Sequence, residues 1–159
     1  MSRFTHLHVH SKYSILDGAA EISQMYKKAV SDNMPAIALT DHGNMYGVFK
    51  FVAEAEKYNK KGEAPVIKPI VGCEFYLVED RHKKQFTREQ KDYRYHQLLL
   101  AKNTTGYNNI VKLCSLGYME GLYSKYPRID KELILQYHEG LIATTCCLAA
   151  EVPRAIMNK

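Results

Sequence analysis

Three histidines alternate with apolar residues near the start of the chain, in the order His6-Leu7-His8-Val9-His10. The pattern predicts a strand over residues 4–10, and alternation along a strand places the three imidazoles on one face. Imidazoles on a buried face carry a desolvation cost, which a bound metal ion removes because neutral imidazole is a common metal ligand. The alternative is a fortuitous histidine cluster on an edge strand.

Four further candidate ligands lie just after predicted strands. Asp17 lies in the loop behind the histidine strand, His42 follows the second strand, Glu74 ends the third, and Cys147 follows the last. Sites in α/β folds gather at the carboxyl ends of strands, so these side chains are expected at one rim. Taken singly, each also has a structural explanation: a turn, a surface position, an ion pair or an inert core thiol.

His96 fits this rule poorly, because it opens a predicted strand at its amino end. It reaches the common site only if residues 74–78 and 96–101 run as a hairpin; otherwise it is a partly exposed, hydrogen-bonded histidine. The remaining cysteines are expected in the core and two other histidines on the surface: Cys73, Cys114 and Cys146, and His82 and His138.

Mixed nitrogen and oxygen ligands of this kind can hold two or three divalent ions, and a carboxylate such as Glu74 can bridge two of them. Such clusters activate water and bind phosphoester oxygens. The chain has no GxGxxG, GxxxxGK[ST] or GxSxG motif, which disfavours nucleotide-driven and serine-hydrolase chemistry.

Composition supports one globular domain that can position these residues. The chain has 159 residues, 46% hydrophobic and 25% charged, with a formal net charge of +5. These values exclude a disordered tail and a collagen-like chain. The four cysteines lack CxxC spacing, so we expect a reducing, cytoplasmic setting. We expect neither a signal peptide nor a membrane span.

Periodicity and breaker residues predict alternating strands and helices. The predicted strands cover residues 4–10, 36–40, 66–71, 75–78, 96–101 and 141–145, with a bend at Gly72. The predicted helices cover residues 21–32, 46–59, 104–119, 130–137 and 148–157. Lys61-Gly62 is expected to end the second helix, Asp130 to cap the fourth, and residues 79–92 to form a solvated loop. The alternation favours a mostly parallel α/β fold, either a truncated α/β barrel or an open doubly wound sheet.

Two motifs resemble the PHP (polymerase and histidinol phosphatase) domain family. They are His8-Val9-His10-Ser11 with Asp17-Gly18, and Leu39-Thr40-Asp41-His42-Gly43-Asn44. Residues 13–18, 68–75, 96–103 and 127–130 are similar, more narrowly, to the PHP domain at the N-terminus of bacterial replicative DNA polymerase alpha subunits. The resemblance covers essentially the whole chain.

The resemblance implies a distorted (β/α)7 barrel, truncated here before its last strands. Residues 1–159 would then be an incomplete PHP domain without polymerase domains, since the family's final Asp-x-His ligands do not occur in the sequence. It also implies up to three divalent ions, of zinc, manganese or iron, and Asp17 and Glu74 as the catalytic carboxylates. The implied metal ligands are His8, His10, Asp17, His42, Glu74, His96 and Cys147, but not His6.

The function implied by the resemblance is metal-dependent phosphoester hydrolysis, as a 3′-5′ exonuclease, within a DNA-directed DNA polymerase. The expected partners are a DNA primer 3′ end, the remaining polymerase domains and other replisome subunits. Two alternatives stay open: a catalytically silent module that stabilises the polymerase, and a phosphoesterase similar to histidinol phosphatase.

Overall fold

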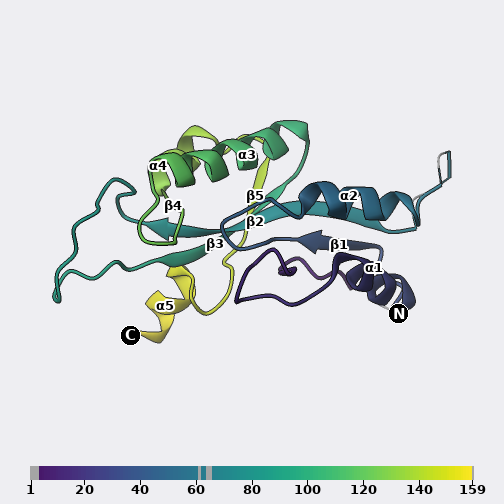
Figure 1. The fold of residues 1–159 in the computed structure, drawn as a ribbon, viewed down its shortest axis with the longest axis horizontal. Coiled ribbons are helices and arrows are strands. Elements are labelled where there is room, and N and C mark those ends of the chain that lie inside the picture. The colour runs from purple at the N-terminus through teal and green to yellow at the C-terminus, as the bar shows by residue number, and fades with distance from the viewer. Residues whose placement is uncertain (1–3, 61, 64–65, 159) are drawn as a thin grey trace.

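The computed structural model describes residues 4–60, 62–63 and 66–158. Five strands form one mixed sheet: β1 (Ala36–Leu39), β2 (Lys68–Val78), β3 (Tyr95–Ala101), β4 (Arg128–Asp130) and β5 (Leu141–Ala143). The helices are α1 (Ile22–Ser31), α2 (Val48–Glu56), α3 (Thr104–Met119), α4 (Lys131–Gln136) and α5 (Glu151–Met157). Figure 1 shows α2, α3 and α4 along one side of the sheet, with the N-terminal segment and α5 on the other.

The long strand β2 organises the sheet. Its first part pairs in parallel with β1 and its last part in parallel with β4, whereas β3 pairs with it antiparallel. Strand β5 continues the sheet antiparallel to β3. The α/β class is therefore confirmed, but the expected mostly parallel order is wrong. The reason is that β2 and β3 are joined by a hairpin connection instead of a helical crossover.

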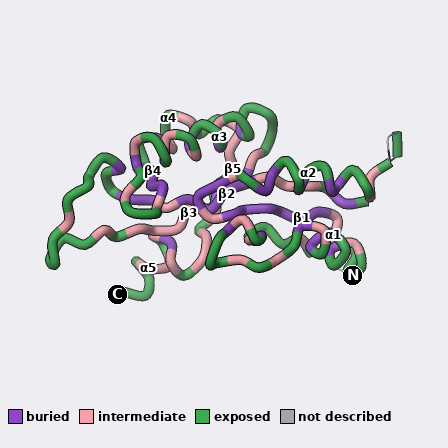
Figure 2. The backbone as a smooth tube through the Cα atoms, viewed as in Figure 1, coloured by how far each residue is buried: buried purple, intermediate pink, exposed green. Residues whose placement is uncertain are grey.

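Alternation along β2 separates the core from the opposite face of the sheet. Cys73, Phe75 and Leu77 point toward α3 and pack in one buried cluster with its residues Ile110 and Leu113. Glu74 and Tyr76 consequently point to the opposite face of the sheet, which α3 does not cover. A second cluster buries α1 and α2 against β1, and Figure 2 shows β1 buried throughout.

The N-terminal segment is not a regular strand, so the prediction over residues 4–10 is wrong. Two backbone hydrogen bonds attach it to β1, from Ala38 N to His6 O (3.0 Å) and from Thr40 N to Val9 O (2.9 Å). Val9 N donates to the Thr40 side-chain hydroxyl at 2.8 Å instead of to a carbonyl. The ladder is interrupted there, although the chain still runs along β1.

Gly72 does not bend the third strand, because β2 is continuous from Lys68 to Val78. A Cβ atom at Gly72 would lie 2.6 Å from both Leu99 O and Leu100 Cδ2. The glycine is therefore required where β3 approaches β2 closely.

Most helix predictions are confirmed to within a few residues, and α3 matches its predicted range. Asp130 caps α4 by accepting a hydrogen bond from Leu133 N at 3.1 Å. The second and last predicted helices are shorter than expected, and the three-residue strand β4 was missed. Lys61 lies outside the described residues, but α2 already ends at Glu56, so the prediction that Lys61-Gly62 ends this helix is wrong.

The loop between β2 and β3 is less solvated than its composition indicates. Arg81 is buried and donates to Asp130 at 2.8 Å and to Glu120 at 2.7 Å. Arg128, which is fully buried, donates to the backbone carbonyls of Arg81 and Lys83. These bonds fix the base of the loop against α3 and β4. None of the described helices is long and apolar enough to cross a membrane.

Two glycines of α3 differ in how closely a neighbouring segment approaches their Cα atoms. A Cβ atom at Gly106 would lie 1.9 Å from Gly140 O, whereas at Gly117 the nearest atom is Ile129 Cγ2 at 3.3 Å. We expect Gly106→Ala to destabilise the fold by about 2 kcal/mol, because a backbone clash forces α3 away from β5.

Gly117→Ala is the matched control and should change the free energy of unfolding by less than about 1 kcal/mol, because it gains helix propensity. Urea denaturation of both variants provides the measurement. Equal stabilities would contradict the close approach at Gly106.

Candidate metal centre

The structure brings all seven predicted ligands together around Glu74. Three groups of ligand atoms have spacings that can hold a metal ion, and Glu74 belongs to each of them. The groups are His10, Asp17, His42 and Glu74; His8, Glu74 and Cys146; and Glu74, His96 and Cys147. His6, which the structure describes, belongs to none of these groups.

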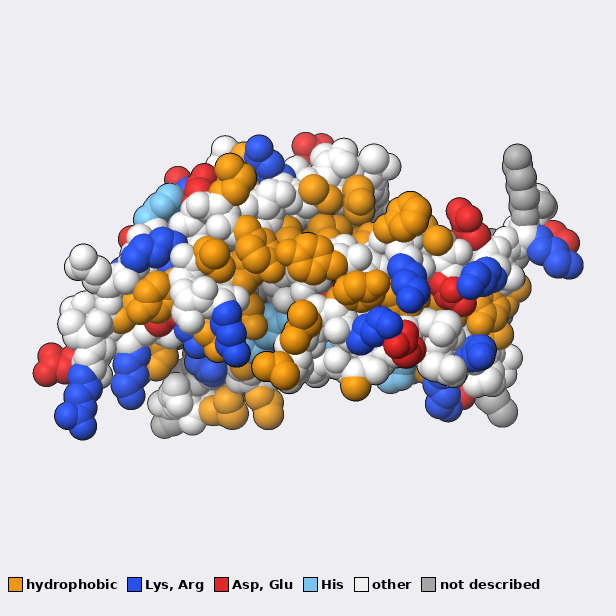
Figure 3. All heavy atoms as spheres, in the orientation of Figure 1, with side chains coloured by type: hydrophobic (Ala, Val, Ile, Leu, Met, Phe, Trp, Pro, Cys, Tyr) orange, Lys and Arg blue, Asp and Glu red, His pale blue; other side chains and the backbone are white. Residues whose placement is uncertain are grey.

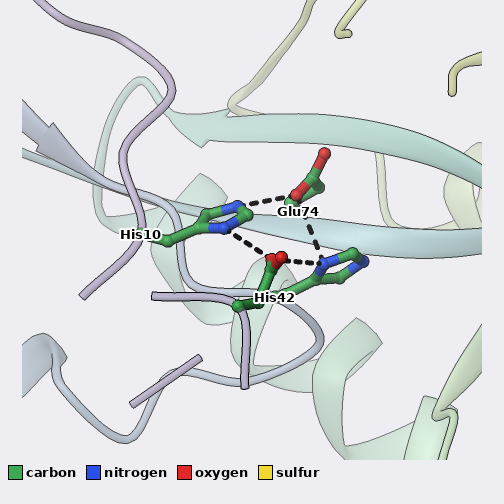
Figure 4. A group of neighbouring side chains, drawn as sticks. His10, His42 and Glu74 are labelled. Atoms are coloured by element: carbon green, nitrogen blue, oxygen red, sulfur yellow. Dashed lines mark hydrogen bonds and ion pairs between the residues drawn. The ribbon is translucent and has the colours of Figure 1, made fainter. Parts of the chain in front are cut away.

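Glu74 is the centre of this arrangement and has only 1% of its side chain exposed. Its Oε1 atom lies 3.0 Å from His8 Nε2 and 3.0 Å from His96 Nδ1. Its Oε2 atom lies 2.7 Å from His10 Nε2 and 3.5 Å from His42 Nδ1. Figure 4 shows His10 and His42 pointing toward Glu74 from different segments of the chain. The two carboxylate oxygens therefore face different groups of ligands.

The hairpin formed by β2 and β3 explains how His96 reaches the site. In the antiparallel register Leu98 lies opposite Glu74, and His96 lies opposite Tyr76. Side chains at Glu74, Tyr76 and His96 therefore share one face of the sheet. This is the hairpin condition that the sequence left open, and the structure meets it.

A second buried carboxylate, Asp41, positions the loop that carries Asp17. Asp41 Oδ1 accepts hydrogen bonds from Ser11 N at 2.7 Å and Ser14 Oγ at 2.7 Å. Ser14 Oγ in turn accepts from His42 N at 2.9 Å, which ties the two ligand loops together. Sequence reasoning assigned no role in the site to Asp41, although its position between a strand end and His42 is a usable signal.

Asp17 lies at the open side of the cluster, with 54% of its side chain exposed. Its Oδ2 atom contacts His10 Nδ1 at 2.8 Å and His42 Nδ1 at 3.3 Å. Asp17 N donates to Ser14 O at 2.9 Å, so the turn fixed by Asp41 also fixes the carboxylate. Asp17 and Glu74 thus contact the same histidines, but the Asp17 carboxylate is exposed and the Glu74 carboxylate is buried.

Both neighbouring cysteines approach Glu74, so the expectation that Cys146 is simply a core residue is incomplete. Cys146 Sγ lies 3.4 Å and Cys147 Sγ 3.7 Å from Glu74 Oε1. Cys146 has a φ of 56°, a left-handed conformation that turns the chain so that both sulfurs face the same carboxylate. Cys147 Sγ also lies 3.5 Å from His96 Nδ1.

The charges of the cluster favour an ionised carboxylate surrounded by imidazoles. Burial alone would raise the pKa of Glu74, but the imidazoles of His10, His8 and His96 outweigh burial and hold its pKa well below the ordinary value. Burial lowers the pKa of His42, whereas Glu74 raises the pKa of His10 against the effect of burial. A low carboxylate pKa preserves the charge that a metal ion requires.

The donor atoms themselves fit a divalent ion. Three buried atoms of the cluster have no hydrogen bond of good geometry: His10 Nε2, His42 Nε2 and Glu74 Oε2. Unpaired buried polar atoms are costly, and a cation that accepts their lone pairs removes the cost. The mixture of imidazole, carboxylate and thiol donors suits zinc, manganese or iron.

A cavity of about 790 Å³ opens beside the cluster. Asp17, His42 and His96 line it together with Tyr76 and Tyr126. In Figure 3 histidine side chains are visible within a hollow whose rim carries hydrophobic side chains, with Lys and Arg side chains nearby. The cluster is therefore accessible to a ligand of moderate size.

Comparison with known proteins identifies relatives along nearly the whole chain. The PHP domain model matches residues 6–159. DNA polymerase III subunit alpha of Borreliella burgdorferi is 49% identical over 159 residues, which is 98% of this chain and 13% of that protein. The Thermus aquaticus protein of the same name is 42% identical over 98% of this chain and 12% of its own length. The chain thus spans about an eighth of the length of the curated relatives it matches.

A solved structure from Bifidobacterium adolescentis, described as a metal-dependent phosphoesterase, is also similar. It is 15% identical, covers 72% of this chain and 35% of its own, and has a TM-score of 0.45.

Because Glu74 belongs to all three ligand groups, Glu74→Gln should remove most of the bound metal. The matched control is Glu54→Gln, which neutralises a buried glutamate on α2 that pairs with Lys57. Elemental mass spectrometry of protein purified without chelators measures the metal. Loss of ions held at 100 times their dissociation constant removes about 2.7 kcal/mol of stability. Full metal content in Glu74→Gln would refute its central position.

The two cysteines are expected to differ as ligands. Cys147 Sγ contacts two other candidate ligands, whereas Cys146 packs beside Ala38, Leu98 and Leu100, and burial raises the pKa of its thiol to about 12. In cobalt-loaded protein, Cys147→Ser should reduce the thiolate-to-cobalt absorption band more than Cys146→Ser does. The reverse order would assign the thiolate ligand to Cys146.

Proposed function

The chain belongs to the PHP domain family, and from this membership we propose that its Glu74-centred cluster hydrolyses phosphoesters with the aid of divalent metal ions. We propose more narrowly that it acts as a 3′-5′ exonuclease on DNA. The observation that carries the proposal is the sharing of one buried carboxylate among three groups of ligand atoms. A multinuclear centre of this kind is suited to binding both oxygens of an in-line displacement at phosphorus.

Bound divalent ions would supply Lewis-acid stabilisation of the phosphoester oxygens and would lower the pKa of a bound water. The residues of the chain divide the remaining tasks. Glu74 is buried and stays ionised, so it holds the cluster together throughout the reaction. Asp17 is half exposed at the cavity, where its carboxylate can accept a proton from the attacking water. His10 and His42 orient Asp17 through its Oδ2 atom.

The relatives named DNA polymerase III subunit alpha support a role in DNA replication. We propose that the chain works as one domain of a replicative DNA polymerase, a nucleotidyltransferase, in the cytoplasm. Its partners would be a primer 3′ end, the remaining polymerase domains and other replisome subunits. The five-stranded sheet would form part of the distorted (β/α)7 barrel of the family. That this domain is incomplete without an Asp-x-His pair stays a prediction.

Asp17→Asn tests the proposed function. We expect the manganese- or zinc-loaded protein to shorten a 5′-labelled single-stranded DNA from its 3′ end. Asp17→Asn should slow this about 100-fold or more, because it removes the proton acceptor. Glu21→Gln is the matched control, since it neutralises a nearby exposed carboxylate that pairs with Lys12 at 2.7 Å.

Two results would replace the proposal with another function, and a third would change its mechanism. No shortening by metal-loaded protein, together with lower thermal stability on metal removal, would support a silent structural module. Hydrolysis of histidinol phosphate but not DNA would support a small-molecule phosphoesterase. Equal activity of Asp17→Asn and Glu21→Gln would remove Asp17 from the mechanism.

A further inference from the structure

We propose that Arg94 binds the phosphate group of the substrate beside the metal centre, held in position by the ring of Tyr126. The inference rests on the proposed phosphoester chemistry and adds the residue that positions the anion. Arg94 lines the same cavity as the candidate ligands Asp17, His42 and His96. It precedes His96 by two residues, at the point where the β2–β3 loop enters β3.

Contacts within the protein hold the Arg94 guanidinium in place but leave most of its N–H groups without an acceptor. Its Cζ atom lies 3.7 Å from the centre of the Tyr126 ring, and Nη1 donates to Asp92. Within the described residues, Asp92 is its only hydrogen-bond acceptor. Because a guanidinium has five N–H donors, most of them stay available in the cavity.

Asp92 does not neutralise Arg94, because two guanidiniums share its carboxylate. Asp92 Oδ1 accepts from Arg128 Nη1 at 2.9 Å, while the other oxygen accepts from Arg94. Arg128 is fully buried and directs its remaining donors to the carbonyls of Gly121, Arg81 and Lys83. Two guanidiniums and one carboxylate, those of Arg94, Arg128 and Asp92, therefore have a net charge of one positive unit. Arg94 carries this charge at the cavity, with 27% of its side chain exposed.

A stack of rings links this cation to the metal ligands. Tyr126 meets Tyr76 edge-on with ring centres 5.0 Å apart, and Tyr76 stacks on His42 at 4.0 Å. The rings are packed against one another, so the position of Arg94 is coupled to that of the ligand His42. An anion bound by Arg94 would lie beside the cluster where phosphoester hydrolysis is proposed.

Two other cations, Lys125 and Arg154, also line the cavity, but their settings differ. Lys125 Nζ lies 5.6 Å from the Tyr126 ring centre, and the Arg154 guanidinium lies 5.5 Å from the ring centre of Tyr95. Arg94 combines close stacking with a planar pair of donors, the geometry that binds two phosphate oxygens at once.

Arg94→Gln is the test, and Lys112→Gln is the control, because Lys112 is an exposed α3 residue that does not line the cavity. Both variants lose one positive charge. The probes are inorganic phosphate, by calorimetric titration of the zinc-loaded protein, and bis(4-nitrophenyl) phosphate hydrolysis. We expect Arg94→Gln to weaken phosphate binding and to raise KM about 10- to 100-fold, with metal content unchanged. Lys112→Gln should match the wild type.

Arg94→Lys guards against a folding defect, since it keeps the charge beside Asp92 but lacks the planar donor pair. It should also bind phosphate more weakly at normal metal content and thermal stability. Wild-type affinity for phosphate in a folded, metal-loaded Arg94→Gln protein would overturn the inference and leave the hydrolytic function standing. Phosphate binding that depends on Arg94, in a protein without hydrolytic activity, would support the inference and overturn the function.

Discussion

The burial of the Glu74 carboxylate is the constraint on which the site depends. An ionised group with 1% exposure is tolerated only where charged or hydrogen-bonding partners surround it. Here those partners come from the N-terminal segment, the loop after β1, strand β3 and the turn before α5. The cost of burying one charge thus specifies how four separate segments meet β2. The same arrangement gives metal ions a set of converging donors.

Two buried carboxylates perform different tasks in this part of the fold. Asp41 takes its hydrogen bonds from Ser11 and Ser14, so its charge is satisfied by the polypeptide itself. Glu74 instead faces imidazoles, and its Oε2 atom keeps no hydrogen bond of good geometry. The first carboxylate therefore stabilises a loop, whereas the second retains the capacity to bind a cation. Both carboxylates act on neighbouring Asp17: Asp41 fixes the turn that carries it, and Glu74 binds the same histidine, His10, that Asp17 contacts.

Sequence patterns predicted correctly the features that depend on interactions between residues close together in the chain. The range of α3 and the capping role of Asp130 follow from periodicity and side-chain hydrogen bonding within a few residues. The alternation of His8 and His10 placed both imidazoles correctly even though the segment lacks a regular ladder.

Features fixed by tertiary contacts were harder to predict. The antiparallel pairing of β2 with β3 and the three-residue β4 depend on partners distant in sequence. Cys146 joins the cluster through a left-handed backbone conformation, which the composition of its neighbourhood does not reveal. The candidate metal ligands could be collected from motifs, but the face of the sheet on which they meet needed the structure.

The spread of the ligand atoms along the chain also has a consequence for biosynthesis. His8 precedes every strand that the structure describes, whereas Cys147 follows β5, the last of them. Contacts between such distant residues close late, since the intervening loops must first be ordered. In a nascent polypeptide, the group of His10, Asp17, His42 and Glu74 is synthesised first, whereas the group of Glu74, His96 and Cys147 stays incomplete until Cys147 has been added. The full set of three ligand groups is therefore absent from chains whose synthesis stops before Cys147.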